Sequence, residues 1–328
     1  MCFGHDGEGA LRESLERKGA SRRGLMRGAA AGAAGAAALT VGGPAMAGTS
    51  SARGRGGHRP REVRDDLISI QLYTLRAFMT SDSNIKLMLD QLAGYGYERV
   101  ERAGLYSYTA AQLKTEQDAR GIWASSSHEG ISADETALNK TLDDANTFRQ
   151  KYIVVPYLNS SSKSDWQQWA EQMNTEAAVA RGRGLRYGYH NHAHEFTIDL
   201  GGGETPWDVL TSELDPRLVH LEVDLYWAYT GGVNSGAADP LAFTNDVIRS
   251  APQEVRQYHV KDRHGADAEL LYGQQPGDMA DLGLGVIDFP AIFKKHQVEE
   301  YIVENDSPDF RPAATASAGF RYLQGLDF

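Results

Sequence analysis

Cysteine is almost absent from this chain of 328 residues, whose one cysteine is Cys2. We expect the segment around Cys2 to be removed, so the mature protein would have neither disulfide bonds nor thiolate ligands. Nitrogen and oxygen atoms would then have to bind any metal. Long hydrophobic runs are missing as well. The apolar stretch at residues 29–41 is mostly Ala and Gly, and it is shorter than the roughly 20 strongly apolar residues of a membrane-spanning helix.

Basic residues are outnumbered, because 33 Lys and Arg stand against 44 Asp and Glu and give a formal net charge of −11. The first 47 residues contain six basic and four acidic side chains, so the rest of the chain carries −13. Nucleic acids and anionic membranes attract basic surfaces. We therefore expect neither as a partner and no membrane span after leader cleavage, whereas a small polar substrate remains compatible with this charge.

The N-terminus has the three parts of a signal peptide. Arg22 and Arg23 precede the apolar stretch, and Ala45 and Ala47 flank Met46 as small residues do at a cleavage site. We predict a twin-arginine signal peptide at residues 1–47 and a flexible linker at 48–65. A disordered basic tail is the alternative. The resemblance to twin-arginine leaders implies export of a folded protein to the periplasm or the medium, with any metal loaded in the cytoplasm.

From residue 66 to 328, short apolar runs alternate with amphipathic stretches that have helical spacing, as at Leu138 and Leu142. Gly94, Gly121 and Gly184 are expected to end helices. The predicted strands are 68–72, 99–102, 122–126, 152–156, 185–190, 219–224, 257–260 and 301–304. Eight such repeats predict an α/β fold with a single (β/α)8 TIM barrel at residues 66–328. A doubly wound sheet is the alternative, but residues 71–74 lack its glycine-rich phosphate turn.

Four predicted strands end in a side chain that binds metals, namely His190, Asp224, His259 and Glu304. The C-terminal ends of the strands form the mouth of a TIM barrel, where active sites are built. We therefore expect one divalent metal ion at the mouth, and this donor set favours Mn, Zn, Co or Fe(II) over Mg. Asp224 has an alternative function as the N-cap of the next helix.

Two further side chains are predicted to be catalytic beside Glu304. His192 and Lys261 lie two residues beyond His190 and His259, so strand alternation places them on the same face. The ammonium of Lys261 would stabilise a developing oxyanion or donate a proton, unless it only forms a salt bridge. Glu222 is expected one layer deeper, where it would orient a metal ligand.

Other polar and aromatic side chains follow the predicted strands and are expected to contact a substrate. They are Gln71, Tyr73, Glu101, His128, Tyr157, Glu195, Trp227 and Arg263. A purely structural function is the alternative for each of them, and core packing is the alternative for the tryptophan.

Five segments resemble the xylose-isomerase-like TIM-barrel superfamily, in particular its sugar phosphate isomerase/epimerase group. They are YHNH (189–192), EVDLYW (222–227), HVKD (259–262), GLGVIDF (283–289) and VEND (303–306). Ketose 3-epimerases of this superfamily hold their metal with Glu, Asp, His and Glu. The resemblance implies Asp224, His259 and Glu304 for the last three, whereas the first falls on His190. Only one of the two proton-exchanging glutamates is therefore present, and His192 or Lys261 would supply the second acid/base.

The predicted function is that of a metal-dependent sugar isomerase or epimerase, which removes a proton next to a carbonyl of a sugar or keto-sugar and passes through a metal-stabilised enediolate. Elimination from or hydration of a 3-keto-glycoside, as in exported relatives of this type, is the alternative. A non-catalytic exported sugar-binding barrel is the second alternative. The sequence leaves the exact substrate, the native metal and the oligomeric state open.

Overall fold

The computed structural model describes residues 61–328 except 269, 271–273 and 309–310. The predicted signal peptide and most of the predicted linker lie outside the described residues. At the start of the described chain, the Arg61 amide donates to the Phe328 carbonyl, and Glu62 forms an antiparallel bridge with Asp327. The last residues of the predicted linker therefore pair with the C-terminus of the barrel.

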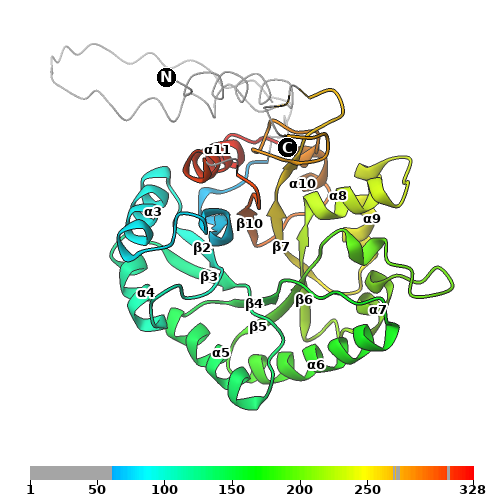
Figure 1. The fold of residues 1–328 in the computed structure, drawn as a ribbon, viewed down its shortest axis with the longest axis horizontal. Coiled ribbons are helices and arrows are strands. Elements are labelled where there is room, and N and C mark those ends of the chain that lie inside the picture. The colour runs from blue at the N-terminus through cyan, green and yellow to red at the C-terminus, as the bar shows by residue number, and fades with distance from the viewer. Residues whose placement is uncertain (1–60, 269, 271–273, 309–310) are drawn as a thin grey trace, which may run out of the picture.

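Eight parallel strands form one sheet that curves into a barrel (Figure 1), in the order β3-β2-β1-β10-β7-β6-β5-β4. A parallel bridge between His128 and Val154 joins the two ends of this order and closes the ring. The predicted TIM barrel is thus confirmed. The strands are β1 (Ile68–Gln71), β2 (Arg99–Arg102), β3 (Trp123–Ser127), β4 (Tyr152–Val155), β5 (Arg186–His190), β6 (Val219–Asp224), β7 (Val255–Val260) and β10 (Glu300–Val303).

Helices surround the barrel on its outside (Figure 1). They are α3 (Asp82–Tyr95), α4 (Ala110–Asp118), α5 (Glu135–Phe148), α6 (Lys163–Gly182), α7 (Pro206–Glu213), α8 (Leu225–Asn234), α9 (Pro240–Ser250), α10 (Phe289–Phe293) and α11 (Pro312–Gln324). Short 3-10 turns complete them: η1 (Asp65–Leu67), η2 (Leu72–Leu75) and η3 (His194–Phe196). No helix in the described part of the chain is both long and apolar enough to cross a membrane.

Two features differ from the prediction. Gly94 lies inside α3, and Gly96 ends that helix with a φ of 105°, a left-handed conformation in which glycine has no Cβ to clash. The predicted end at Gly94 was therefore wrong by two residues, whereas Gly121 and Gly184 have positive φ just after α4 and α6. A two-stranded ribbon, β8 (Asp262–Arg263) with β9 (Met279–Ala280), follows β7 and was not predicted.

The barrel interior below the mouth is polar. Glu300 is fully buried and accepts hydrogen bonds from the Ser125 hydroxyl and from Gln257 Nε2, the latter over 3.0 Å. The Gln257 Oε1 atom lies 3.0 Å from His220 Nε2. The His220 ring in turn covers Gly188, where a Cβ would lie 2.5 Å from the imidazole. Burial raises the pKa of Glu300 to about 7, against the opposing hydrogen bond from Ser125.

Glu300 should make folding less favourable as the pH rises. Between the unfolded pKa of 4.5 and the folded pKa of about 7, the folded state holds a proton that the unfolded state lacks. Raising the pH through this window therefore favours unfolding, by up to about 1.4 kcal/mol per pH unit. The Glu300→Gln variant keeps the hydrogen-bonding shape without the charge, and its free energy of unfolding should fall less between pH 5 and pH 7 than that of the wild type.

Urea unfolding at several pH values measures this difference. Glu171→Gln is the control, because Glu171 lies exposed on α6. Parallel pH curves for the wild type and Glu300→Gln would show that Glu300 is ionised in the folded barrel.

Candidate metal site at the barrel mouth

Four neighbouring strands bring the predicted metal ligands to one end of the barrel. His190 ends β5, Asp224 ends β6, His259 lies one residue before the end of β7, and Glu304 directly follows β10. In the sheet, His259 pairs with Asp224 on β6. On its other side it pairs with Ile302 on β10, two residues before Glu304. All four side chains are buried, so their polar atoms need partners inside the barrel.

Three of these residues form the mouth site, which we define as Asp224, His259 and Glu304. Each offers one donor atom, and these atoms lie within 4.8 Å of one another. His259 Nδ1 is 2.6 Å from Glu304 Oε2. His190 lies at its edge, with Nε2 3.6 Å from Asp224 Oδ2. The structure thus brings three of the four predicted ligands into one group of donor atoms, and His190 lies beside Asp224 at the edge of that group.

Asp224 combines the two functions that the sequence left open. Its Oδ1 atom accepts a hydrogen bond of 2.8 Å from the Trp227 amide and so caps α8, whereas Oδ2 faces the mouth site. Asn191 holds this residue in place. Its Oδ1 accepts from the Asp224 amide over 3.0 Å, and its Nδ2 donates to the Asp224 carbonyl. Sequence reasoning missed Asn191, because nothing in the residue pattern shows a side chain that bonds to the next strand.

A deep cluster of Glu101, His128 and Glu222 lies against the two ligand imidazoles. Glu222 Oε1 is 3.2 Å from His190 Nδ1 and 2.9 Å from His259 Nε2. Glu101 Oε1 is 2.7 Å from His259 Nε2. Carboxylates in this position accept the ring N–H and thereby turn the other ring nitrogen toward a metal. The expectation that Glu222 orients a ligand agrees with these contacts.

The mouth site fits a divalent cation. When His259 donates from Nε2 to Glu101, a neutral ring has a lone pair at Nδ1, which faces Glu304 Oε2. His259 Nδ1 and Glu304 Oε2 would then be two acceptors only 2.6 Å apart. They need a positive centre between them, which is either a second proton on the ring or a metal ion. Burial lowers the pKa of His259, but the charges of Glu222, Glu304 and Glu101 outweigh it and hold that pKa well above its usual value. The site therefore strongly attracts positive charge.

His128, His190, Glu222 and His259 form a second set of donors within 4.8 Å. This set shares only His259 with the mouth site, and it uses the opposite nitrogen, Nε2, of that ring. A neutral imidazole binds a metal through one nitrogen only. The mouth site is the better candidate, since Asp224 Oδ2 and Glu304 Oε2 already face a cation there, namely Lys261.

Lys261 forms the salt bridges that were the alternative to its catalytic function. Its Nζ atom lies 2.6 Å from Glu304 Oε2, 2.9 Å from Asp224 Oδ2 and 3.0 Å from Asp306 Oδ2. Burial lowers the pKa of Lys261, but the three carboxylates outweigh it, and the pKa lies well above its usual value. The side chain is therefore a permanent ammonium at the mouth.

His192 and Trp227 form an aromatic wall beside this ammonium. Their ring centroids are 5.2 Å apart, and Tyr157 packs edge-on against His192. Burial, together with the charge of Lys261, lowers the pKa of His192 to about 3, so its imidazole is neutral. Among the described residues, His192 Nδ1 and Trp227 Nε1 have no hydrogen-bond partner. The wall therefore offers two polar atoms to a ligand.

The remaining predicted substrate contacts divide into rim and buried residues. Tyr73 and Tyr157 are 43% and 52% exposed, so both are accessible at the ends of their strands. Gln71 is buried and donates to Glu101 Oε1 over 2.8 Å. His128 lies 3.1 Å from the same oxygen and stacks on His259. Gln71 and His128 thus support the ligand imidazoles from below.

Glu195 and Arg263 are engaged with the protein. Glu195 is buried and accepts from the Tyr189 hydroxyl over 2.7 Å and from the His192 amide over 2.9 Å. It therefore holds the loop that carries His192. The Arg263 Nε atom donates to Thr230 Oγ1 over 3.2 Å. These contacts indicate that Glu195 and Arg263 hold neighbouring parts of the protein in place, whereas we had expected both to contact a substrate.

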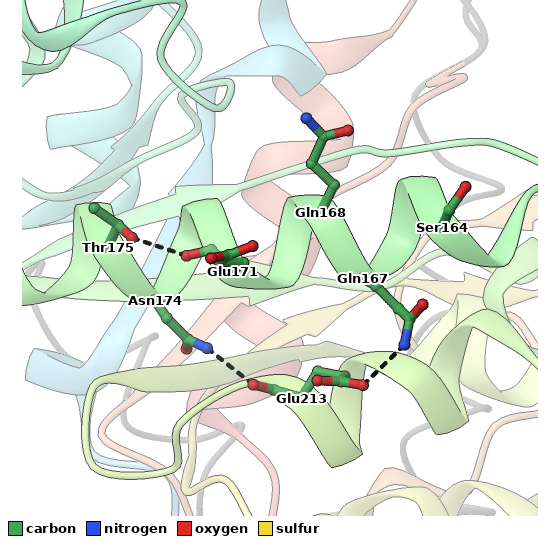
Figure 2. A pocket seen from close by; sticks show the side chains of 7 residues that line it. All are labelled: Ser164, Gln167, Gln168, Glu171, Asn174, Thr175 and Glu213. Carbon is green, nitrogen blue, oxygen red and sulfur yellow. Dashed lines mark hydrogen bonds between the residues drawn. The ribbon is translucent and has the colours of Figure 1, made fainter.

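A surface hollow of about 710 Å³ lies elsewhere, on the outside of the barrel. Figure 2 shows its lining side chains along α6, with Glu213 on the neighbouring α7. Gln167 donates to the Glu213 carboxylate and Asn174 to the Glu213 carbonyl (Figure 2). These side chains bond to one another and include no imidazole, so the hollow has no part in the chemistry of the mouth.

Comparison with known proteins confirms the superfamily expected from the sequence. The profile of the xylose isomerase-like TIM barrel family matches residues 69–324. An inosose dehydratase of Salmonella typhimurium is 25% identical over 277 residues, which cover 75% of this chain and 89% of that protein.

Two solved structures share the fold. A sugar phosphate isomerase/epimerase from Parabacteroides distasonis is 23% identical with a TM-score of 0.61, over 80% of this chain and 95% of that chain. A xylose isomerase-like TIM barrel protein from Mycobacterium smegmatis, in complex with magnesium, is 13% identical with a TM-score of 0.57, over 78% and 95% of the two chains.

Removal of a ligand should lower the metal content of the purified protein while the barrel stays folded. We expect this for His259→Ala and Glu304→Gln, because both residues lie at the mouth and outside the hydrophobic core. Glu222→Gln should keep the ligands but weaken metal binding about 10–100-fold, since it loosens the orientation of two imidazoles. Elemental analysis and circular dichroism measure both effects, with Glu171→Gln as the control. Full metal content in His259→Ala and in Glu304→Gln would show that the ligand set is wrong.

Proposed function

The chain belongs to the xylose isomerase-like TIM barrel family, and we propose that it is a divalent-metal-dependent enzyme that removes a proton next to a carbonyl of a sugar or sugar-derived ketone. One observation carries this proposal. Asp224, His259 and Glu304 converge at the mouth with a permanent ammonium, Lys261, on the same oxygens. A binding protein without catalysis has little need of this buried charge, so the non-catalytic alternative is not favoured.

A divalent ion bound at the mouth site would polarise a carbonyl and stabilise the charge that develops when the neighbouring carbon loses its proton. The chain's own groups supply the proton transfers. Burial raises the pKa of Glu304, but Lys261 and His259 outweigh it and hold that pKa well below its usual value. Glu304 is thus a carboxylate that can accept a proton. Lys261 donates hydrogen bonds to a developing oxyanion.

His192 is the candidate for the second acid/base. Its ring is neutral, and Nδ1 has no hydrogen-bond partner in the described part of the chain, so this atom is free to form a hydrogen bond with a bound molecule. Trp227 packs beside it and provides a flat apolar face and one N–H donor. A ring-shaped polyhydroxylated ketone matches such a wall, because it offers both a C–H face and hydroxyl groups.

Two outcomes follow from proton removal. Return of the proton gives isomerisation or epimerisation, whereas loss of a substituent from the next carbon gives elimination. The curated relatives are named inosose dehydratases, a name that describes loss of water. We therefore favour elimination, with a free hydroxyl or the aglycone of a 3-keto-glycoside as the leaving group. A divalent ion other than Mg fits best, because His259 and, at the edge of the site, His190 offer imidazole nitrogens.

Incubation of the metal-loaded protein with inososes, ketoses and 3-keto-glycosides should release water or an aglycone and form an unsaturated ketone. NMR of the products detects this, and a chelator should stop the reaction. Clean interconversion of two ketoses or epimers without an unsaturated product would contradict elimination and support the isomerase. No conversion of any of these ketones by the fully metal-loaded protein would contradict the proposed function.

Replacement of the second acid/base should slow turnover and leave the metal in place. His192→Ala should lower kcat by roughly 10²–10⁴-fold, because a lost proton carrier acts in the transition state. His296→Ala is the matched control, since His296 Nδ1 lies 2.8 Å from the Tyr258 hydroxyl and His296 belongs to neither group of donor atoms. A larger change in KM than in kcat for His192→Ala would instead identify a residue that only binds the substrate.

Export by the twin-arginine pathway is a separate proposal that rests on Arg22 and Arg23. The exported protein should begin at or near Gly48 in N-terminal sequencing. Replacement of both arginines by lysine should retain the protein inside the cell, and unimpaired export of that variant would refute the assignment.

A further inference from the structure

Lys261 contacts the same carboxylate oxygens that face a metal at the mouth site. Its Nζ atom is 2.9 Å from Asp224 Oδ2 and 2.6 Å from Glu304 Oε2. Both carboxylates also belong to the mouth site's donor group with His259. An ammonium and a divalent ion that bind the same two oxygens repel each other over a few ångström in a buried site. The two cations therefore compete.

Asp306 provides a second place for the ammonium. Its Oδ2 atom lies 3.0 Å from Lys261 Nζ, and its side chain is 24% exposed, against 0% and 4% for Asp224 and Glu304. It lies outside both groups of donor atoms that could hold a metal. A lysine that leaves the mouth site can thus keep one carboxylate partner, Asp306, which lies beyond the end of the neighbouring strand β10.

The side chain also has an apolar neighbour at the mouth. Its Nζ atom is 5.8 Å from the centroid of the Trp227 ring, within the range of a cation–π contact. Asp306 and the Trp227 ring together can hold the ammonium beside the aromatic wall of His192 and Trp227, where a substrate oxygen would lie.

We propose that Lys261 is an internal counter-cation, which binds the ligand oxygens of Asp224 and Glu304 until a divalent ion displaces its ammonium onto Asp306. This inference rests on the metal dependence in the proposed function but not on any particular reaction. Because of this competition, the protein binds the metal less tightly than it would without the lysine. In return, the carboxylates at the mouth have a positive partner both with and without the metal. Metal binding then also delivers the lysine to the position where it meets a substrate.

Calorimetric titration of the chelator-treated mature protein with MnCl2 tests the competition. Lys261→Met keeps the length of the side chain and removes its charge, so it should bind Mn²⁺ more tightly, on the order of tenfold or more, because no charge-assisted contacts have to be broken first. Without added metal, Lys261→Met should also unfold at a lower temperature than the wild type and should gain more from Mn²⁺. Lys163→Met is the control, since Lys163 pairs with Glu204 outside the mouth site.

Asp306→Asn distinguishes displacement from a simple effect of charge. Loss of the second carboxylate should weaken Mn²⁺ binding in the wild-type background, because the displaced ammonium loses its partner. In the Lys261→Met background the same change should have little effect. A purely electrostatic contribution of Asp306 would instead weaken binding equally in both backgrounds. If Lys261→Met does not fold, Lys261→Gln, which also lacks the charge but keeps a polar end, provides the second background for the same comparison.

Unchanged or weaker Mn²⁺ binding by folded Lys261→Met, or equal effects of Asp306→Asn in both backgrounds, would overturn the inference. Failure of every variant to bind Mn²⁺ would overturn it together with the metal dependence. The expected order of affinities without turnover of any ketone would leave the inference standing and refute only the proposed reaction.

Discussion

Four carboxylates, Glu101, Glu222, Asp224 and Glu304, are buried at the mouth of this barrel with 0–4% of their surface exposed. Carboxylates in such a place persist only with positive charge or hydrogen-bond donors around them. Much of the arrangement at the mouth follows from this constraint. Imidazoles separate the deep pair from the outer pair, and Lys261 bridges the outer pair. The site is therefore suited to bind a cation, and its chemistry depends on whether that cation is the ammonium of Lys261 or a metal ion.

The barrel architecture makes this concentration of charge possible. Parallel strands present their ends at one edge, so residues far apart in the sequence meet after folding. Below the mouth, side chains from neighbouring strands bond to one another, as Ser125 and Gln257 do to Glu300. The strands and helices thus stabilise the fold. The mouth can therefore carry buried charge that is unfavourable for folding but serves the function.

The sequence predicted the eight strands, and the same pattern placed the four candidate ligands at strand ends that the structure brings close together. A charged residue directly after an apolar run, such as Glu304, is costly unless it has a partner, and the fold class tells where that partner lies. The sequence could not show that Lys261 lies on the ligand oxygens or that Asn191 clamps Asp224, because side-chain contacts between strands depend on register. The ribbon of β8 and β9 was missed because two residues per strand are too few for a periodic pattern.

We expect the metal on the outer side of the His259 ring, and anomalous diffraction from crystals soaked in MnCl2 or ZnCl2 locates it directly. One peak should lie among Asp224 Oδ2, His259 Nδ1 and Glu304 Oε2, with Lys261 Nζ next to Asp306. A peak on the opposite face of His259, among His128, His190 and Glu222, would contradict this expectation.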